Sequence, residues 1–259
     1  MFQNKYLFIF FVIFFPLSFL AQETPKKNYT IGVQSFKYYL PYSQFSNGKY
    51  SGFNKELLDM FAKNKDYNFT YKAYPLKRLY KTFLNQKLDF KYPDNPYWNA
   101  SLKEKSNILY SDTVIEYIDG VMVLPENKNK KPQELKKLAI VAAFTPYPYL
   151  KDIKEGKIKT YEVFDYRNLI TKALKKKVDG IYSNIAVSQY YLKNVLDKKN
   201  QLVFDDNLPY IKNYRSLSSI KYPHIIVEFN AFLKEKKRDI DILKKKYNLN
   251  NSLTPKNNR

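Results

Sequence analysis

Residues 29–53 read YTIGVQSFKYYLPYSQFSNGKYSGF, and this stretch sets a pattern that the rest of the chain repeats. Its first residues, 29–33, are rich in aromatic and β-branched side chains, which favours a strand. A segment with Pro and Gly follows and leads into residues 54–63, whose apolar side chains fall on one side of a helix. The sequence therefore predicts a strand, a turn-rich connection and a helix as the first structural unit.

Short strands and amphipathic helices alternate along the remaining chain, which is typical of α/β folds. Further strands are expected at residues 68–73, 88–90, 138–143, 160–164 and 178–182. Helices are expected at residues 76–84, 149–155, 166–176 and 224–237, with a short terminal helix ending near residue 249. The extended stretches 113–124 and 214–220 are interpreted as crossings between two lobes. We expect residues 28–117 plus 212–249 to form lobe 1 and residues 118–211 to form lobe 2.

The N-terminal residues have the pattern of a secretory signal. Lys5 is followed by an apolar run over residues 6–20 and then by polar residues. We expect residues 1–21 to be removed and the protein to be exported to the periplasm. An uncleaved anchor is the alternative, although the run is shorter than the roughly 20 residues that span a bilayer. The polar tail, residues 250–259, is expected to be disordered.

The composition is basic and free of cysteine. The 45 Lys and Arg against 24 Asp and Glu give a formal net charge of +21, and the lysines are spread along the whole chain. This spread favours solvated helix faces, while a polyanion-binding or membrane-surface-binding protein is the alternative. The lack of Cys and the single His exclude disulfides, thiolate sites and the common metal clusters. We expect no cofactor, no metal and no nucleic-acid partner.

Several motifs occur in an order and at a spacing that mark a known family. They are residues 31–33 (IGV), 40–42 (LPY), 47–53 (NGKYSGF), 109–112 (LYSD), 177–180 (KVDG) and 246–249 (KYNL). Together they resemble the amino-acid-binding branch, family 3, of the type II periplasmic solute-binding proteins of ABC transporters, over roughly residues 29–249. The resemblance implies an α/β, two-lobed fold with two extended crossover segments and a central ligand cleft. It also implies a monomer that captures a small molecule by hinge closure and delivers it to the membrane permease of an ABC importer.

Two departures from the family pattern bear on the ligand. The family commonly places an Arg that clamps the ligand carboxylate near residues 101–105, where this chain has Lys103 and Lys105 but no Arg. The family's acidic residue for the ligand ammonium group corresponds to Asn184. We therefore expect a small polar metabolite, amino-acid-like or anionic, rather than an α-amino acid held in the family's usual way.

The resemblance places the ligand at strand ends and helix starts that face the cleft. On the first lobe the candidate ligand-binding residues are Tyr39, Tyr42, Lys91, Tyr92, Asp94, Asn95, Trp98 and Lys103. On the second lobe they are Phe144, Thr145, Tyr147 and Asn184. Each has a structural alternative: the aromatic residues could pack a lobe edge, Asp94 and Asn95 are common turn formers, and Thr145 could cap a helix.

Other functions stay open at this point. Some proteins similar to this family are dehydratases with a carboxyl group as general acid, for which Asp94 or Glu116 are the candidates. No residue pair supports catalysis, so we expect a binding protein without catalytic residues. The single His224 follows Pro223 at an expected helix start, where a structural role is favoured. The same lobes could also serve as a sensor input that needs a separate membrane partner.

Overall fold

The computed structural model describes residues 26–142 and 144–249, in which ten strands form one sheet and two strands form a separate hairpin. The strand order along the main path is β4-β1-β5-β12-β7-β10-β8-β9, with β6 beside β12 and β11 beside β7. The predicted signal, residues 1–21, and the predicted tail, residues 250–259, lie outside the described residues. None of the helices in the described ranges combines the length and the apolar composition that a membrane crossing requires.

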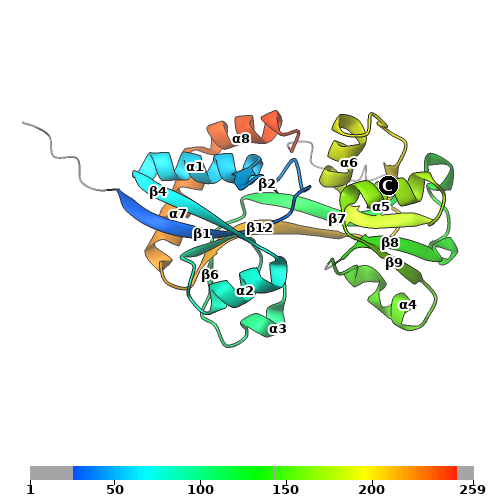
Figure 1. Ribbon diagram of the computed structural model, residues 1–259, viewed down its shortest axis with the longest axis horizontal. Coiled ribbons are helices and arrows are strands. Elements are labelled where there is room, and N and C mark those ends of the chain that lie inside the picture. The colour runs from blue at the N-terminus through cyan, green and yellow to red at the C-terminus, as the bar shows by residue number, and fades with distance from the viewer. Residues whose placement is uncertain (1–25, 143, 250–259) are drawn as a thin grey trace, which may run out of the picture.

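The first lobe is the left half of Figure 1. Its strands are β1 (Lys27–Gln34), β2 (Gln44–Ser46), β3 (Lys49–Ser51), β4 (Tyr67–Tyr74), β5 (Phe90–Asp94) and β6 (Leu109–Tyr110). Its helices are α1 (Phe53–Lys65), α2 (Leu76–Leu84), α3 (Ala100–Lys103), α7 (Pro223–Glu235) and α8 (Lys237–Lys246). β1 pairs in parallel with both β4 and β5, with α1 and α8 above this sheet and α2 and α3 below it (Figure 1). Aromatic packing fills the upper side, where the Phe61 ring of α1 lies 4.9 Å from the Phe229 ring of α7.

The second lobe repeats this arrangement in the right half of Figure 1. Its strands are β8 (Lys137–Val141), β9 (Lys159–Val163), β10 (Gly180–Asn184) and β11 (Val203–Phe204). Its helices are α4 (Leu150–Lys154), α5 (Tyr166–Leu174) and α6 (Ile185–Asn194), and single turns of 3-10 helix lie at Pro125–Asn127, Pro132–Glu134 and Tyr147–Tyr149. β8 pairs in parallel with β9 and β10, so the carboxyl ends of these strands lie at one edge of the sheet. This edge faces the first lobe, since Phe144, which follows β8, contacts Phe36.

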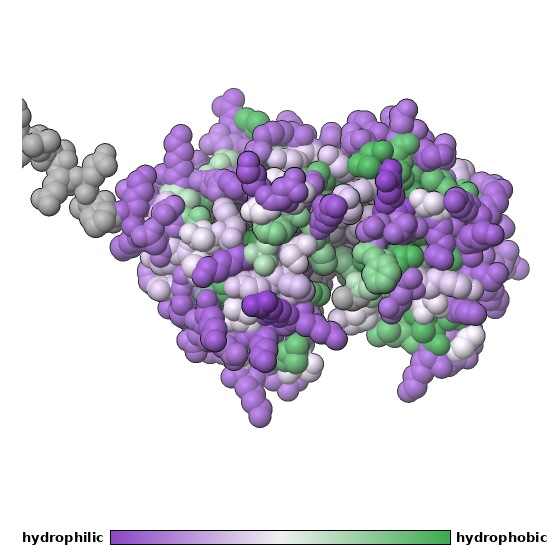
Figure 2. Space-filling view, in the orientation of Figure 1, coloured by the Kyte–Doolittle hydropathy of each residue, from purple (hydrophilic) through white to green (hydrophobic). Residues whose placement is uncertain are grey.

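Two long antiparallel strands join the lobes. β7 (Ile115–Val123) leaves the first lobe and β12 (Ile211–Ser219) returns to it. Arg215 pairs with Ile115, and Ile211 pairs with Asp119. Directly opposed residues of an antiparallel pair point to the same side, so Arg215 and Asp119 lie on one face of this two-stranded connection. Figure 2 shows a largely hydrophilic surface whose outline is notched at its lower edge where the lobes meet.

The structure corrects one strand and adds two helices, α3 and α6, and four short strands, β2, β3, β6 and β11. The third strand, expected at residues 88–90, is observed as β5, which runs through Tyr92 and Pro93 to Asp94. The polar residues and the proline in this segment indicated a loop. All five residues of β5 are nevertheless buried, and Asp94 is paired with two lysines. Helix α6 was not expected, because its aromatic and apolar residues do not form a one-sided pattern; it begins where the Asn184 side chain accepts a hydrogen bond from the backbone of Val187.

Candidate functional site

A buried arginine at the junction of the lobes is enclosed by four aromatic rings. The Arg215 side chain is 2% exposed, and its guanidinium carbon lies 4.0 Å from the ring centre of Tyr42. The corresponding distances are 5.0 Å to Tyr117, 5.3 Å to Tyr39 and 5.9 Å to Trp98. Arg215 also donates a hydrogen bond of 2.9 Å from Nη2 to the Tyr39 hydroxyl. We call these four rings the cage; such contacts attract a cation electrostatically.

The crossing strands position one side of the cage. Arg215 on β12 and Tyr117 on β7 share the face of the connection that also carries Ile115. Trp98 follows β5 and donates a hydrogen bond of 2.8 Å from Nε1 to the Tyr117 hydroxyl. The rings of Trp98 and Tyr117 are therefore fixed relative to each other as well as to the guanidinium.

The loop after β1 supplies the other side of the cage. Tyr39 and Tyr42 both lie in this loop and are 5% and 2% exposed. Gly52, just before α1, has a positive φ of 101°, and a Cβ added there would meet the Tyr42 carbonyl oxygen at 2.8 Å. A glycine is required for this conformation and this close approach. The sequence SGF at the start of α1 thus seats the loop that holds both tyrosines.

The caged guanidinium has unused hydrogen-bonding capacity. The Nε atom of Arg215 is buried without a hydrogen-bond partner. Within residues 26–142 and 144–249, Arg215 forms no ion pair with a carboxylate. Burying an unpaired charge is costly, and the cage offsets only part of that cost. An unpaired buried guanidinium between two lobes is therefore suited to receive an anion.

A carboxyl group lies on the same face of the crossing strands. The side chain of Asp119 is partly buried and accepts a hydrogen bond of 2.9 Å from Nδ2 of Asn184. Burial raises the pKa of Asp119 to about 6, while Arg215 and the Asn184 hydrogen bond act in the lowering direction. Asn184 also caps α6 through its Oδ1, so its amide is held from both ends.

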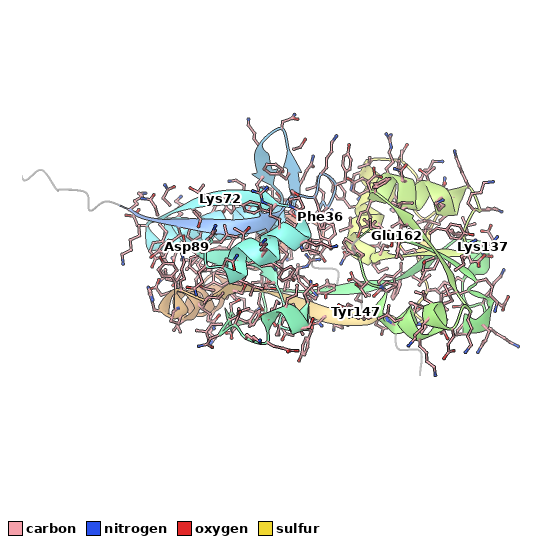
Figure 3. The ribbon with its side chains drawn as sticks, turned by 60° about the horizontal axis from the view of Figure 1, so that its bottom comes forward. Phe36, Lys72, Asp89, Lys137, Tyr147 and Glu162 are labelled. Carbon is pink, nitrogen blue, oxygen red and sulfur yellow. The ribbon has the colours of Figure 1, made fainter. Side chains whose placement is uncertain are left out.

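Aromatic rings of the two lobes meet across the junction. Phe36 of the first lobe lies 5.9 Å from Phe144 of the second, and Tyr39 lies 5.9 Å from Tyr166 and 6.1 Å from Phe144. Figure 3 shows Phe36 at the junction and Tyr147 at its lower edge. These ring contacts hold the lobes together in this conformation.

A second buried cluster of cations lies on the α2 side of the first-lobe sheet. The Nζ atoms of Lys91 and Lys103 each lie 2.9 Å from Oδ1 of Asp94. The other Asp94 oxygen accepts a hydrogen bond of 2.7 Å from Ser218, and Lys91 lies 4.4 Å from the Tyr80 ring centre. Burial raises the pKa of Asp94, but the two lysines overcome this effect and hold it below its ordinary value. All three charged groups are therefore satisfied within the protein.

The other predicted ligand contacts have different surroundings. Tyr92 is fully buried and its hydroxyl has no hydrogen-bond partner among the described residues. Asn95 is buried and donates a hydrogen bond of 2.9 Å to Asn213, which ties the turn after β5 to β12. Thr145 and Tyr147 are exposed beside the junction. Of the predicted ligand contacts, the structure thus brings Tyr39, Tyr42 and Trp98 around Arg215.

The residues considered for catalysis or metal binding lie apart. Glu116 is exposed on the face of the crossing strands opposite to Arg215, where it forms an ion pair of 3.0 Å with Lys212. His224 lies in the first turn of α7 with its ring 6.1 Å from that of Tyr222. In the part of the chain that the structure describes, no group of three or more His, Cys, Asp or Glu side chains is placed to hold a metal ion.

A groove of about 960 Å³ lies beside the cage, between α6, the crossing strands and the end of α8. Tyr42 and Tyr117 line this groove as well as the cage. Its lysines Lys193, Lys199 and Lys245 form no ion pair within the described ranges. The groove therefore adds a positive potential close to Arg215.

Sequence reasoning missed Arg215, Asp119 and Tyr117. The family pattern directed attention to residues 101–105 for the carboxylate clamp, whereas the arginine at the junction comes from the returning strand. The sequence does contain one signal: most positive charges of this chain are lysines, yet an arginine stands in the segment expected to cross between the lobes. Its aromatic partners are more than 90 residues away in sequence, so no local pattern could identify them.

Comparisons with known proteins support the fold. The sequence matches no model of a protein family, and it matches no curated protein. Among solved structures, the ligand-binding core of GluR0 in complex with L-glutamate superposes with a TM-score of 0.68 at 13% identity, covering 86% of this chain and 99% of that chain. An ancestral arginine-binding protein bound to arginine gives a TM-score of 0.64 at 18% identity, covering 86% and 98%.

A third similar structure is an ancestral amino acid-binding protein described as a precursor of cyclohexadienyl dehydratase. It gives a TM-score of 0.64 at 20% identity and covers 84% of this chain and 94% of that chain. At these identities the likeness establishes the fold. The chain has the two-lobed α/β fold of the periplasmic amino-acid-binding proteins, as the sequence motifs predicted.

Proposed function

We propose that the chain is an extracytoplasmic solute-binding protein that captures a small polar metabolite, amino-acid-like or anionic, by closing its two lobes. The observation that carries this proposal is the unpaired, fully buried Arg215 at the junction of the lobes. Small-molecule sites with few polar groups among aromatic walls commonly lie between domains. Two crossing strands are a connection about which such lobes can open and close.

The structural neighbours support a binding role of this kind, since two of the three named above are described as complexes, one with glutamate and one with arginine. In this proposal the protein works in the periplasm as a monomer and hands its ligand to the permease of an ABC importer. Tyr39, Tyr42 and Trp98 contact the ligand together with Arg215, and Phe144, Thr145, Tyr147 and Asn184 approach it from the second lobe. The network of Lys91, Tyr92, Asp94, Asn95 and Lys103 supports the site from below.

A thermal-shift screen of the purified protein against a metabolite library tests this proposal. A true ligand at 100 times its Kd stabilises the folded state by about 2.7 kcal/mol, which is a rise in Tm of about 5–10 °C for a chain of this size. If the lobes are open in the ligand-free protein, small-angle scattering should show that the complex with the stabilising compound is more compact than the free protein. Stabilisation by polyanions alone, lost in added salt, would instead indicate surface binding.

An enzyme of the dehydratase kind is a second candidate, because Asp119 is a partly buried carboxyl group with a pKa raised to about 6 at the junction. Such a group can donate a proton near neutral pH. Incubating each stabilising compound with the protein and analysing it by mass spectrometry separates the two functions. An unchanged compound supports capture, and a product that has lost water, with no product from Asp119→Asn, supports catalysis.

A further inference from the structure

We infer that the caged guanidinium of Arg215 makes this site selective for small anionic solutes, such as dicarboxylates, and closes it to cationic ones. This inference rests on the proposed function, since it names the ligand class of the same site. It follows from three features of the molecule. Four aromatic rings form a cage for a cation, the cation inside the cage is Arg215 of the chain itself, and hydrogen-bond donors at Arg215 have no acceptors among the described residues.

The cage has the form of a cation site. Four rings surround one position at distances of 4.0–5.9 Å, and the Tyr39 hydroxyl accepts a hydrogen bond from the group that occupies it. Aromatic rings in this arrangement favour a guanidinium or an ammonium group. In this protein the position is filled by the chain itself, so a ligand cation finds the favourable place already taken.

The occupant is fixed by its backbone. Arg215 pairs with Ile115 across the crossing strands, and its carbonyl oxygen accepts a hydrogen bond of 3.0 Å from the backbone of Val114. The next residue, Ser216, pairs with Asp94 of the first-lobe sheet. Because the strand is bonded on both sides, the backbone of Arg215 is fixed beside the cage, and the hydrogen bond to the Tyr39 hydroxyl holds the guanidinium inside it. The positive charge is therefore a permanent part of the site.

Two hydrogen-bond donors at this charge lack acceptors. The Nε–H of Arg215 and the hydroxyl group of Tyr92 are both buried without partners among the described residues. Burial raises the pKa of Tyr92, while the charge of Arg215 acts in the lowering direction. A carboxylate accepts hydrogen bonds from such donors and neutralises the guanidinium. A second cation in the same space would meet a like charge in a region of low dielectric.

Binding assays with probes of similar size and different charge test the inference. Succinate and glutarate serve as anions, glutamine as the neutral probe, and arginine and lysine as cations. We expect a dicarboxylate to bind at least 100-fold more tightly than either cation, by calorimetry or thermal shift. Arg215→Gln should weaken dicarboxylate binding at least 100-fold, and Arg215→Lys about tenfold, because an ammonium lacks the planar fork.

Chemical rescue distinguishes selection by the charge from a merely structural role. Arg215→Ala empties the cage, so ethylguanidinium should stabilise this variant but leave the wild-type melting temperature unchanged. With ethylguanidinium present, dicarboxylate binding by Arg215→Ala should recover at least tenfold. If these variants fail to fold, Tyr39→Phe provides the test, because it removes only the hydrogen bond to the guanidinium and should weaken anion binding about threefold to tenfold.

The outcomes separate this inference from the proposed function. Wild-type protein that binds arginine or lysine as tightly as the dicarboxylates overturns the inference and leaves solute capture standing. Equal dicarboxylate affinity in wild type and Arg215→Gln also overturns it. If neither these probes nor any metabolite in the library stabilises the protein, the inference and the proposed function both fall.

Discussion

The protein buries positive charge at two places, and the two differ in how that charge is compensated. Below the first-lobe sheet, Lys91 and Lys103 share the carboxylate of Asp94, at 2.9 Å each. At the junction of the lobes, Arg215 is enclosed by rings and has no carboxylate partner among the described residues. Both places are buried and both have aromatic neighbours, so neither burial nor ring contacts distinguish them.

The state of pairing is what distinguishes the two places. A buried ion cluster whose members satisfy one another contributes to the structure, and removing one member leaves an uncompensated charge. A buried cation with a free donor has capacity for a partner from outside the chain. The sequence motifs directed attention to both places, since Lys91, Asp94 and Lys103 of the first and Tyr39, Tyr42 and Trp98 of the second are predicted ligand contacts.

The largest expected effect is on the paired cluster. Asp94→Asn removes the charge that both lysines share and leaves two buried ammonium groups facing a neutral amide. We expect a loss of about 3–5 kcal/mol in the free energy of unfolding, measured by urea denaturation followed by circular dichroism.

Ser218→Ala is the matched control for Asp94→Asn, because it removes one hydrogen bond to Asp94 and leaves the charges paired. Its cost should be about 1–2 kcal/mol. If the two variants lose the same free energy of unfolding, the ion pairs do not stabilise this cluster. The two places would then not differ in how their buried charge is compensated.

A smaller effect of opposite sign is expected at the junction. The pKa of Asp119 is about 6 in the folded protein against an ordinary value of 3.8, so its ionisation opposes folding. The stabilising contribution of the protonated group is complete below about pH 4 and is lost as the pH rises through about 6. Asp119→Asn should therefore raise the stability at pH 8 by on the order of 2 kcal/mol, and should change it little at pH 4.

Asp119 is the group near Arg215 that titrates in this range, because the phenols around it have raised pKa values. These phenols belong to Tyr39, Tyr42, Tyr117, Tyr166 and Tyr182. Melting curves of wild type and Asp119→Asn between pH 4 and pH 8 measure the difference. A constant difference across this range would mean that Asp119 does not change its protonation state there.

The smallest effect on stability is expected for Arg215→Met in the ligand-free protein. The substitution removes the ring contacts of the cation but also the cost of burying it, so the two terms nearly cancel. We expect the free energy of unfolding to change by less than about 1 kcal/mol. A loss of unfolding free energy as large as that of Asp94→Asn would show that the charge of Arg215 is compensated as effectively as that of the lysines. The two places would then not differ.

The fold could be predicted further than the site. Strands β1, β4 and β7 lie close to where the sequence indicated, because each is a local run rich in β-branched and aromatic residues. The third strand was misplaced because Pro93 and Asp94 suggest a loop, while the ion pairs that keep Asp94 buried come from distant positions. Helix α6 was missed because its apolar residues do not form a one-sided pattern and its N-cap, Asn184, was interpreted only as a ligand contact.

The site depends on contacts that no local pattern contains. Tyr39 and Arg215 are 176 positions apart, yet they form one hydrogen bond. Lys103 is the sequence's candidate to replace the family's arginine. Its ammonium group is instead paired with Asp94, and this ion pair depends on the path of the turn after β5, which the sequence does not reveal. The resemblance pointed to the cleft between the lobes, and tertiary packing decides which cation there has no carboxylate partner among the described residues.

Trp98 gives the molecule a built-in optical reporter. It is the only tryptophan in the chain, and its ring lies 5.8 Å from the Lys91 ammonium and 5.9 Å from the Arg215 guanidinium. Because the chain has one tryptophan, fluorescence excited at the red edge of the absorption band comes from Trp98 alone. Indole emission responds to nearby charge, and Trp98 lies near both Lys91 and Arg215. Neutralising Arg215 shifts that emission while the lysine cluster stays constant, which lets occupancy of the junction be followed without any label.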